Sequence, residues 1–302
     1  MATLLQALAA NAPAQPTAPA APAVPGGINT FQSLLQRDTR QYVKMVIFGD
    51  GFTGKTRAAG RLAKLGYTLV YIDMDNASLT LKNDPGLTDE DKSRILLIPI
   101  NDIEGIANLA VTLFDAKKQK SICRTHGFYN CARCVMQKAP VDVIDLTKFD
   151  PETTIVVLDS GRAITDAAIE KVRGDRGGDY KFQLDDWGAL SGIMNTFLRQ
   201  QKQYPMHTIL LTGVEYTKNE ANPLMKSYPQ LGSSTTSGNS IMYFSDLVYA
   251  SNDAQGYKYV CLPHQARGYA VGSRLGIDLL APGLSKDIIL GPFFKEVKPT
   301  TA

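Results

Sequence analysis

Residues 49–56 read Gly49-Asp50-Gly51-Phe52-Thr53-Gly54-Lys55-Thr56, which matches the pattern G-x-x-x-x-G-K-[ST]. An apolar, strand-length run precedes this octapeptide and an amphipathic, helix-length segment follows it. Glycines let successive backbone N–H groups face an anionic phosphate, and the helix adds the positive end of its dipole. A glycine-rich turn without a ligand is the alternative. The flanking pattern favours a nucleoside-triphosphate site, in which Lys55 would bridge the β- and γ-phosphates and the Thr56 hydroxyl would bind Mg²⁺.

Apolar runs of strand length alternate with helix-length segments from Tyr42 onward. The expected strands have continuous Val, Ile and Leu cores, as strands covered on both faces do, at Tyr42–Phe48, Thr68–Asp73, Arg94–Ile100, Thr153–Leu158, Thr208–Thr212, Asp246–Ala250 and Tyr257–Leu262. The expected helices are Lys55–Leu65, Ile103–Ala116, Ala163–Val172 and Trp187–Gln203. This alternation predicts an α/β fold with a mainly parallel sheet flanked by helices, and it leaves segment 117–152 as an apparent insertion.

Carboxylates follow two of the expected strands. Asp159 comes directly after the buried run Thr154–Leu158, where a carboxylate would position the magnesium ion, although capping of the next helix is the alternative. Asp73 and Asp75 follow another strand and share a face, because side chains alternate along a strand. We favour Asp75 as the group that orients an attacking water, since it lies farther toward the ligand edge. Both acids could instead only cap a loop.

The order of these segments resembles the bacterial RecA recombinase core and its phage-encoded relatives. Tyr71-Ile72-Asp73-Met74-Asp75-Asn76-Ala77 is similar to the family segment that ends in the catalytic glutamate, and Val157-Leu158-Asp159-Ser160 is similar to its Asp-Ser metal-binding stretch. Ile95–Asp102 resembles the next strand and turn. Ser234–Ser245 resembles the Thr/Gly/Asn turn and helix that close the second DNA-binding loop. The resemblance covers about residues 42–250 and implies a RecA-like (ASCE) P-loop ATPase.

This resemblance also implies rings or filaments and two loops that bind single-stranded DNA, carried over to Gly174–Tyr180 and Lys218–Gly238. Three positions depart from the family pattern. Asp75 stands where a glutamate is usual, so its carboxylate is one methylene shorter. Thr212-Gly213 replaces the polar amide pair that senses the γ-phosphate. The paired lysines that reach a neighbour's nucleotide are absent, and Arg267 or Arg274 would have to substitute for them.

Three of the four cysteines, together with a histidine, form the pattern C-x₂-H-x₄-C-x₂-C at Cys123, His126, Cys131 and Cys134. Cys₃His is a common tetrahedral ligand set for structural Zn²⁺, so the pattern predicts a zinc knuckle inserted at about residues 117–140. A redox pair at Cys131 and Cys134, or incidental thiols, are the alternatives. Cys261 lies in a strand pattern and is expected to be a buried thiol.

The predicted knuckle is also basic. Segment 117–138 has no acidic residue and contains the cations Lys117, Lys118, Lys120, Arg124, Arg133 and Lys138. Phe128 and Tyr129 lie among them. Cations for phosphates beside rings that stack on bases are typical of single-strand binding, whereas a solvated basic face is the alternative.

Composition sets the outer limits. The chain has 302 residues, 20% of them charged, and a formal net charge of +3, which by itself does not indicate a nucleic-acid partner. Its apolar runs are too short to span a membrane, and its uncharged beginning lacks the basic start of a secretory signal, so we expect a cytoplasmic protein, inside a bacterial host cell if it is phage-encoded. Residues 1–30 are interpreted as a disordered Ala/Pro-rich tail or a tethered docking peptide, 31–265 as the ATPase core, and 266–302 as an extension.

The sequence therefore predicts an ATP- and Mg²⁺-dependent ATPase that binds single-stranded DNA, assembles with copies of itself and acts in phage DNA recombination or annealing. Its tail would meet a partner protein if it is a docking peptide rather than a disordered tail. Two alternatives stay open: a hexameric helicase-type motor on the same core, and a zinc-containing adaptor gated by nucleotide with little turnover.

Overall fold

The computed structural model describes residues 42–115, 117–138, 143–219, 222–254, 256–262, 270–280 and 287–297. The predicted tail at 1–30 and Arg267 lie outside these ranges, as do parts of the insertion and of the C-terminal extension. Contacts group residues 41–302 into one compact unit, to which the described residues belong.

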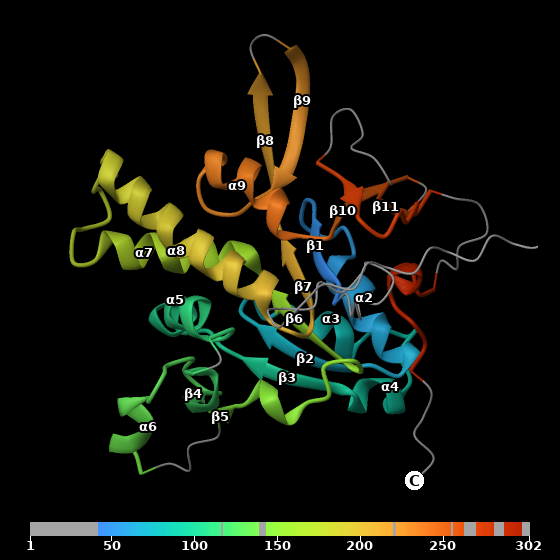
Figure 1. The fold of residues 1–302 in the computed structure, drawn as a ribbon, viewed down its shortest axis with the longest axis horizontal. Helices are drawn as coiled ribbons and strands as arrows, with labels where there is room; N and C mark the ends of the chain where they lie inside the picture. The colour runs from blue at the N-terminus through green and yellow to red at the C-terminus, as the bar shows by residue number, and fades with distance from the viewer. Residues whose placement is uncertain are drawn as a thin grey trace, which may run out of the picture. The chain divides into compact units, whose positions relative to one another are not determined.

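A central sheet runs through this unit (Figure 1). Its strands lie in the spatial order β11-β10-β1-β7-β6-β2-β3, and β12 pairs with β10. Their bounds are β1 Lys44–Phe48, β2 Thr68–Asp73, β3 Ile95–Pro99, β6 Thr154–Asp159, β7 His207–Thr212, β10 Asp246–Asp253, β11 Gly256–Val260 and β12 Gly272–Ser273. All neighbouring pairs from β3 to β10 are parallel, whereas β11 and β12 run antiparallel to β10. The mainly parallel α/β fold predicted from the sequence is confirmed.

Helices cover both faces of the sheet because alternate strand residues feed two separate hydrophobic clusters. Val70 and Val156 point to one face, which α5 (Ile103–Thr112), α7 (Gly161–Arg173) and α8 (Leu184–Gln203) cover. Leu69 and Val157 point to the other, which α2 (Lys55–Gly60) and the 3₁₀ segment η1 (Arg61–Leu65) cover. Figure 1 shows α5, α7 and α8 grouped together and α2 with α3 on the opposite side.

The expected helices form with shifted ends. The first is α-helical only as far as Gly60 and continues as η1, and Gly66, with φ 90°, ends it in the left-handed conformation. The third begins at Gly161 because the Ser160 side chain caps it by accepting the Ala163 N–H. The second ends at Thr112, four residues earlier than expected.

Several elements have no counterpart in the prediction. A two-stranded hairpin, β8 (Val214–Asn219) and β9 (Asn222–Pro229), projects away from the sheet and precedes α9 (Ser234–Ser240) and η4 (Ile241–Tyr243). Two short helices, α3 (Leu79–Lys82) and α4 (Asp89–Ser93), lie between β2 and β3, and η5 (Gly291–Phe293) follows near the end of the chain. The insertion holds η2 (Gln119–Ser121), β4 (Ile122–Cys123), α6 (Ala132–Met136), β5 (Val143–Ile144) and η3 (Leu146–Lys148).

Candidate nucleotide site and metal centre

The glycine-rich loop joins β1 to α2 at the carboxyl edge of the parallel strands. Two of its glycines leave no room for a side chain. A Cβ on Gly49 would lie 2.0 Å from the backbone oxygen of Ala250, and one on Gly54, where φ is +80°, would lie 2.6 Å from the Tyr259 hydroxyl. That hydroxyl donates to the Gly54 carbonyl at 3.0 Å. The strands β10 and β11 therefore hold the loop closely from one side.

Lys55 folds back over the loop. Its ammonium donates to the carbonyls of Gly49 at 2.9 Å and Asp50 at 2.6 Å. Burial lowers the pKa of this ammonium, while the nearby Asp159, Asp50 and Asp75 carboxylates act in the opposite direction. The cation is thus held among acids and loop carbonyls, in a position from which it can turn to an anionic ligand.

A cavity of about 490 Å³ opens beside the loop. Its lining combines loop residues with Arg57 of α2, Asn76 and Ala77 after β2, and Tyr257 of β11. The Arg57 guanidinium lies 5.7 Å from the centre of the Tyr257 ring. The glycine-rich loop, a cation and an aromatic ring therefore border one cavity, whose volume is within the range of small-molecule sites.

Thr56 and Asp159 come together although they are 103 residues apart, with the Thr56 hydroxyl donating to Asp159 Oδ2 at 2.9 Å. Asp159 is at the end of β6, and Tyr71 of β2 donates its hydroxyl to the same carboxylate oxygen. Burial raises the pKa of Asp159, and the hydrogen bonds from Tyr71 and Thr56 oppose that shift. A hydroxyl and a carboxylate are the hard oxygen ligands that Mg²⁺ prefers, so this pair fits the ion.

The structure separates the two acids after β2. Asp73 is 1% exposed, and its carboxylate accepts the backbone N–H groups of Ala77 at 2.9 Å and Ser78 at 3.0 Å. Asp73 therefore holds the turn that follows the strand. Asp75 is exposed, and its carboxylate accepts a hydrogen bond from the Ser160 hydroxyl. The Asp75 backbone N–H also donates to Asp73, at 3.3 Å, so of the two carboxylates only that of Asp75 is free of the backbone turn, and it contacts Ser160 beside the Asp159 strand end.

The hairpin also contacts the loop. Tyr216 of β8 donates its hydroxyl to Asp50 Oδ2 at 2.9 Å, although the two residues are 166 positions apart. Burial and the bond to Asp50 raise the pKa of the Tyr216 phenol. This hydrogen bond ties the base of the hairpin, outside the sheet, to the glycine-rich loop.

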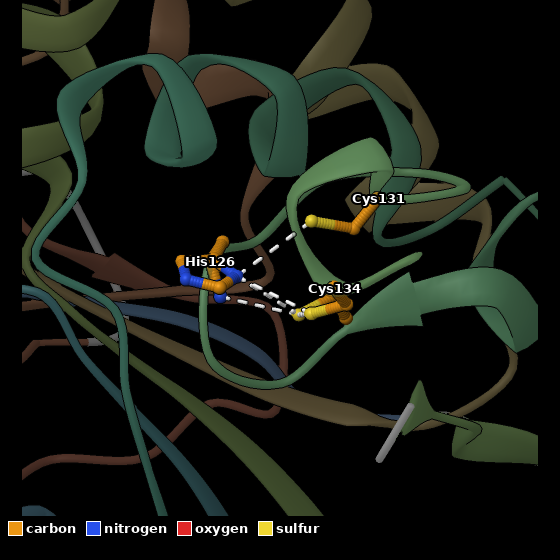
Figure 2. A group of neighbouring side chains, drawn as sticks. His126, Cys131 and Cys134 are labelled. Atoms are coloured by element: carbon orange, nitrogen blue, oxygen red, sulfur yellow. Dashed lines mark hydrogen bonds between the residues drawn. The ribbon is translucent and has the colours of Figure 1, made fainter. Parts of the chain in front are cut away.

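The cysteine cluster forms as predicted from its spacing. The ligand atoms of Cys123, His126, Cys131 and Cys134 all lie within 4.8 Å of one another. Figure 2 shows the His126 imidazole facing the sulfurs, with Nδ1 3.6 Å from Cys131 Sγ and 3.4 Å from Cys134 Sγ. Two sulfurs on one tetrahedral Zn²⁺ are about 3.7 Å apart, since each Zn–S bond is about 2.3 Å. The four side chains therefore have the spacing and the chemistry of a structural zinc site.

The knuckle is packed closely against α5. A Cβ on Gly105 of α5 would lie 1.7 Å from the His126 carbonyl oxygen, and Asn108 donates to the Gly127 carbonyl at 2.9 Å. Arg133 pairs with Asp102 at the start of α5 and with Glu104 at 3.3 Å, and its guanidinium lies 5.0 Å from the centre of the Phe128 ring. Burial opposes ionisation of Asp102, but the bonds from Arg133 and the Gly105 N–H lower its pKa.

This packing reduces the unpaired positive charge that the predicted basic segment presents to solvent. Acids from outside 117–138 pair with two of its six cations: Arg133 as above, and Lys118 with Asp115 at 3.7 Å. Arg124 also has an interaction partner. Lys117, Lys120 and Lys138 are exposed. The cationic surface that faces solvent is therefore smaller than the sequence count suggests.

The two predicted DNA loops have different structures. The segment Gly174–Tyr180 follows α7 and is tied down by Arg176, which bonds to Asp186 at 3.0 Å and stacks 4.1 Å from the Tyr180 ring. The segment Lys218–Gly238 consists mainly of the hairpin and α9. Arg274 is exposed and reaches the Met242 carbonyl at 3.3 Å, away from the residues that line the cavity. Cys261 is fully buried, as expected for a core thiol.

Sequence reasoning assigned no role to several residues at the site. Tyr71, Ser160, Tyr216 and Tyr257 all contact or line it, but none was predicted as a site residue. A signal existed for two of them, because Tyr71 and Ser160 lie in the strand-end segments that carry Asp75 and Asp159. None existed for the other two, which the tertiary structure brings in from distant elements.

Solved structures similar to this chain exist. No family model matches the sequence, and no curated protein matches it. A structure titled as the RadB recombinase is 15% identical, aligns with 75% of this chain and 84% of that one, and gives a TM-score of 0.38. None of the helices in the described ranges is both long and apolar enough to cross a bilayer.

The fold class rests on the chain's own topology. The strand before the glycine-rich loop and the strand that ends at Asp159 are separated by β7, and β2 lies on the far side of β6. This arrangement, with helices on both faces, is a mainly parallel α/β core that carries a glycine-rich loop and a Cys₃His insertion, as expected from the resemblance to a RecA-like core.

Proposed function

We propose that this protein is an ATPase that binds single-stranded DNA and acts in DNA recombination or annealing, with ATP and Mg²⁺ at residues 49–56 and a structural Zn²⁺ in the knuckle. The hydrogen bond between Thr56 and Asp159 is the main support for the nucleotide and Mg²⁺ part of this proposal, because it joins two oxygen-bearing side chains directly beside the glycine-rich loop. A bound Mg²⁺ would neutralise charge on the phosphates.

Each predicted residue then has a role that its surroundings support. Backbone N–H groups of the loop would bind phosphate oxygens, and Lys55 would leave the Gly49 and Asp50 carbonyls for the β- and γ-phosphates. Asp75 would orient the attacking water, since it is exposed and adjacent to Asp159 through Ser160. Arg57 and Tyr257 line the same cavity on the side of the loop helix, where the nucleoside would lie.

Support for the DNA-binding step comes from the surface around the two loops. The hairpin projects from the body of the unit and is tied to Asp50, so a change at the loop can reach it. Beyond α7, the rings of Phe182 and Trp187 lie 5.1 Å apart, and Trp187 is 43% exposed. Exposed rings of this kind are suited to stacking on unpaired bases.

ATP hydrolysis measured with and without single-stranded DNA tests this function. We expect steady-state turnover that DNA stimulates, that Lys55→Ala abolishes and that Asp75→Asn reduces at least a hundredfold. Lys148→Ala, which removes an exposed lysine from η3 outside the cavity, is the matched control and should behave as wild type. Absence of stimulation, together with no DNA retention at low salt, would overturn the proposal.

A second candidate, an adaptor gated by nucleotide with little turnover, is favoured by one observation. The Asp75 carboxylate is shorter than a glutamate and bonds to Ser160, so it reaches less far into the site. Asp75→Glu separates the two functions. A rise in turnover would show that the short side chain limits hydrolysis, whereas nucleotide binding without turnover in both proteins would favour the adaptor.

A further inference from the structure

Tyr71 occupies an unusual position for a fully buried tyrosine. It lies in β2, between β3 and β6, and is 0% exposed. In the register of β2 and β6, Tyr71 is opposite Val157 and Asp73 is opposite Asp159. Because residues two apart share a face of a strand, Tyr71 lies on the face covered by α2, one repeat before the level of Asp159. Its ring packs in the core, and its hydroxyl extends along the sheet toward the strand ends.

The hydroxyl ends at the carboxylate proposed to serve the metal. Tyr71 donates to Asp159 Oδ2, which also accepts the Thr56 hydroxyl at 2.9 Å. Within the described part of the chain, hydrogen bonds engage only this oxygen of the carboxylate, and Oδ1 has no such bond. Two donors on one oxygen fix the rotation of the carboxylate group and leave the other oxygen for the metal or its bound water.

Building on the proposed function, we propose that Tyr71 is a positioning residue for the magnesium site, acting through Asp159. Groups behind a metal ligand hold its orientation, and their removal commonly costs metal affinity about ten- to a hundredfold. The ring of Tyr71 is enclosed by the core and has little freedom, so its hydroxyl is a rigid support. Without Tyr71, Oδ2 would be held only by Thr56 of α2, whose hydroxyl is itself proposed to bind Mg²⁺.

The experiment compares wild type with Tyr71→Phe, which keeps the packed ring and removes only the hydroxyl. Binding of a fluorescent ATP analogue is titrated with Mg²⁺ at fixed nucleotide, and again in EDTA. For Tyr71→Phe we expect the Mg²⁺ concentration at half-maximal binding to rise about tenfold, with affinity in EDTA within about twofold of wild type. Neither measurement requires turnover.

Tyr67→Phe is the matched control. Tyr67 is 3% exposed and belongs to the same hydrophobic cluster, but its ring packs against Phe294 and His207 at the opposite end of the sheet from the loop. A purely structural hydroxyl would affect thermal stability in both variants and metal dependence in neither. Equal Mg²⁺ dependence of Tyr71→Phe and wild type, or an equal loss of affinity with and without Mg²⁺, would overturn the inference.

The wild-type measurements distinguish a failure of the proposed function from a failure of the role proposed for Tyr71. Wild-type protein whose nucleotide binding ignores Mg²⁺ would contradict the proposed function at the metal site itself. Wild-type protein with Mg²⁺-dependent binding that Tyr71→Phe does not alter would leave the proposed function in place and refute the role of Tyr71.

Discussion

The glycine-rich loop and the cysteine knuckle assemble their side chains over very different lengths of chain. The knuckle takes its four ligands from residues 123–134, and short-range backbone bonds shape it: Cys123 N–H to the Phe128 carbonyl at 3.0 Å and Gly127 N–H to the Cys123 carbonyl at 2.9 Å. The nucleotide site pairs Thr56 with a carboxylate 103 residues away. A local ligand set can form around its ion, whereas the nucleotide site requires the whole sheet.

Removal of a zinc ligand should give the largest effect. It tests whether the knuckle is a local metal site that is separate from the nucleotide site. Cys131→Ser removes one of the four ligands, so zinc measured by elemental analysis should fall from about one per chain to near zero. The variant should also lose the free energy of zinc binding, about 10 kcal/mol. Nucleotide affinity should stay within about twofold. Cys261→Ala, at a buried cysteine outside the cluster, should keep its zinc. Wild-type protein that folds without metal would contradict the zinc site.

A substitution where α5 contacts the knuckle tests what the knuckle needs from the rest of the fold. We expect α5 to fix the position of the knuckle but not to be needed for zinc binding. Gly105→Ala places a methyl group 1.7 Å from the His126 carbonyl, so the free energy of unfolding in urea should fall by about 3 kcal/mol. Zinc content should persist, because the ligands are local, while proteolysis within 117–144 should accelerate. Gly192→Ala, on α8 with no atom within 4 Å of the new Cβ, should be neutral or slightly stabilising. Loss of zinc in Gly105→Ala would show that the knuckle is not self-sufficient.

Low pH should lower the free energy of unfolding through His207, which lies in the central sheet. His207 begins β7, and its Nδ1 accepts the Val43 N–H at 3.0 Å. Burial, with Lys44 nearby, lowers the pKa of His207 to about 4 from an ordinary 6.5. The unfolded chain therefore binds the proton more readily, and stability should fall by about 3 kcal/mol as the pH drops from about 6.5 to about 4. His207→Gln keeps an acceptor and should flatten this part of the pH profile. An unchanged slope would exclude His207 as its source.

The smallest expected effect concerns the hairpin. Tyr216→Phe removes one partly exposed hydrogen bond to Asp50, so nucleotide affinity should weaken about two- to fivefold. Tyr228 lies opposite Glu215 on the neighbouring strand, and its hydroxyl makes no side-chain hydrogen bond within the described residues, so Tyr228→Phe is the control. Equal nucleotide affinities in the two variants would show that the nucleotide site is independent of the hairpin.

Much of the fold follows from hydrophobic runs, but the elements between them do not. The parallel strands were predictable because their continuous Val, Ile and Leu residues must be buried on both faces. The hairpin β8–β9 was not, since Val214–Pro229 is largely polar and lacks the continuous apolar runs of the buried strands. The helix ends shifted by a few residues where a cap decides them, as Ser160 does for α7.

The candidate sites divide in the same way. Spacing alone identified the cysteine cluster and the phosphate loop, because contiguous residues impose the geometry. Position along the strand favoured Asp75 over Asp73, although both face the same edge. The backbone hydrogen bonds that engage Asp73 in the turn at Ala77 and Ser78 support that choice.

What the sequence by itself determined are the local patterns: a loop able to bind phosphate, four ligands spaced for one metal ion, and strands that must be buried. Only the tertiary structure decided which distant groups meet them. Register between β2 and β6 brings the Tyr71 hydroxyl to Asp159, close packing on α5 pairs Arg133 with acids outside its segment, and the hairpin reaches Asp50. Spacing along the chain sets contacts between near neighbours, whereas contacts between distant residues follow from how sheets and helices pack.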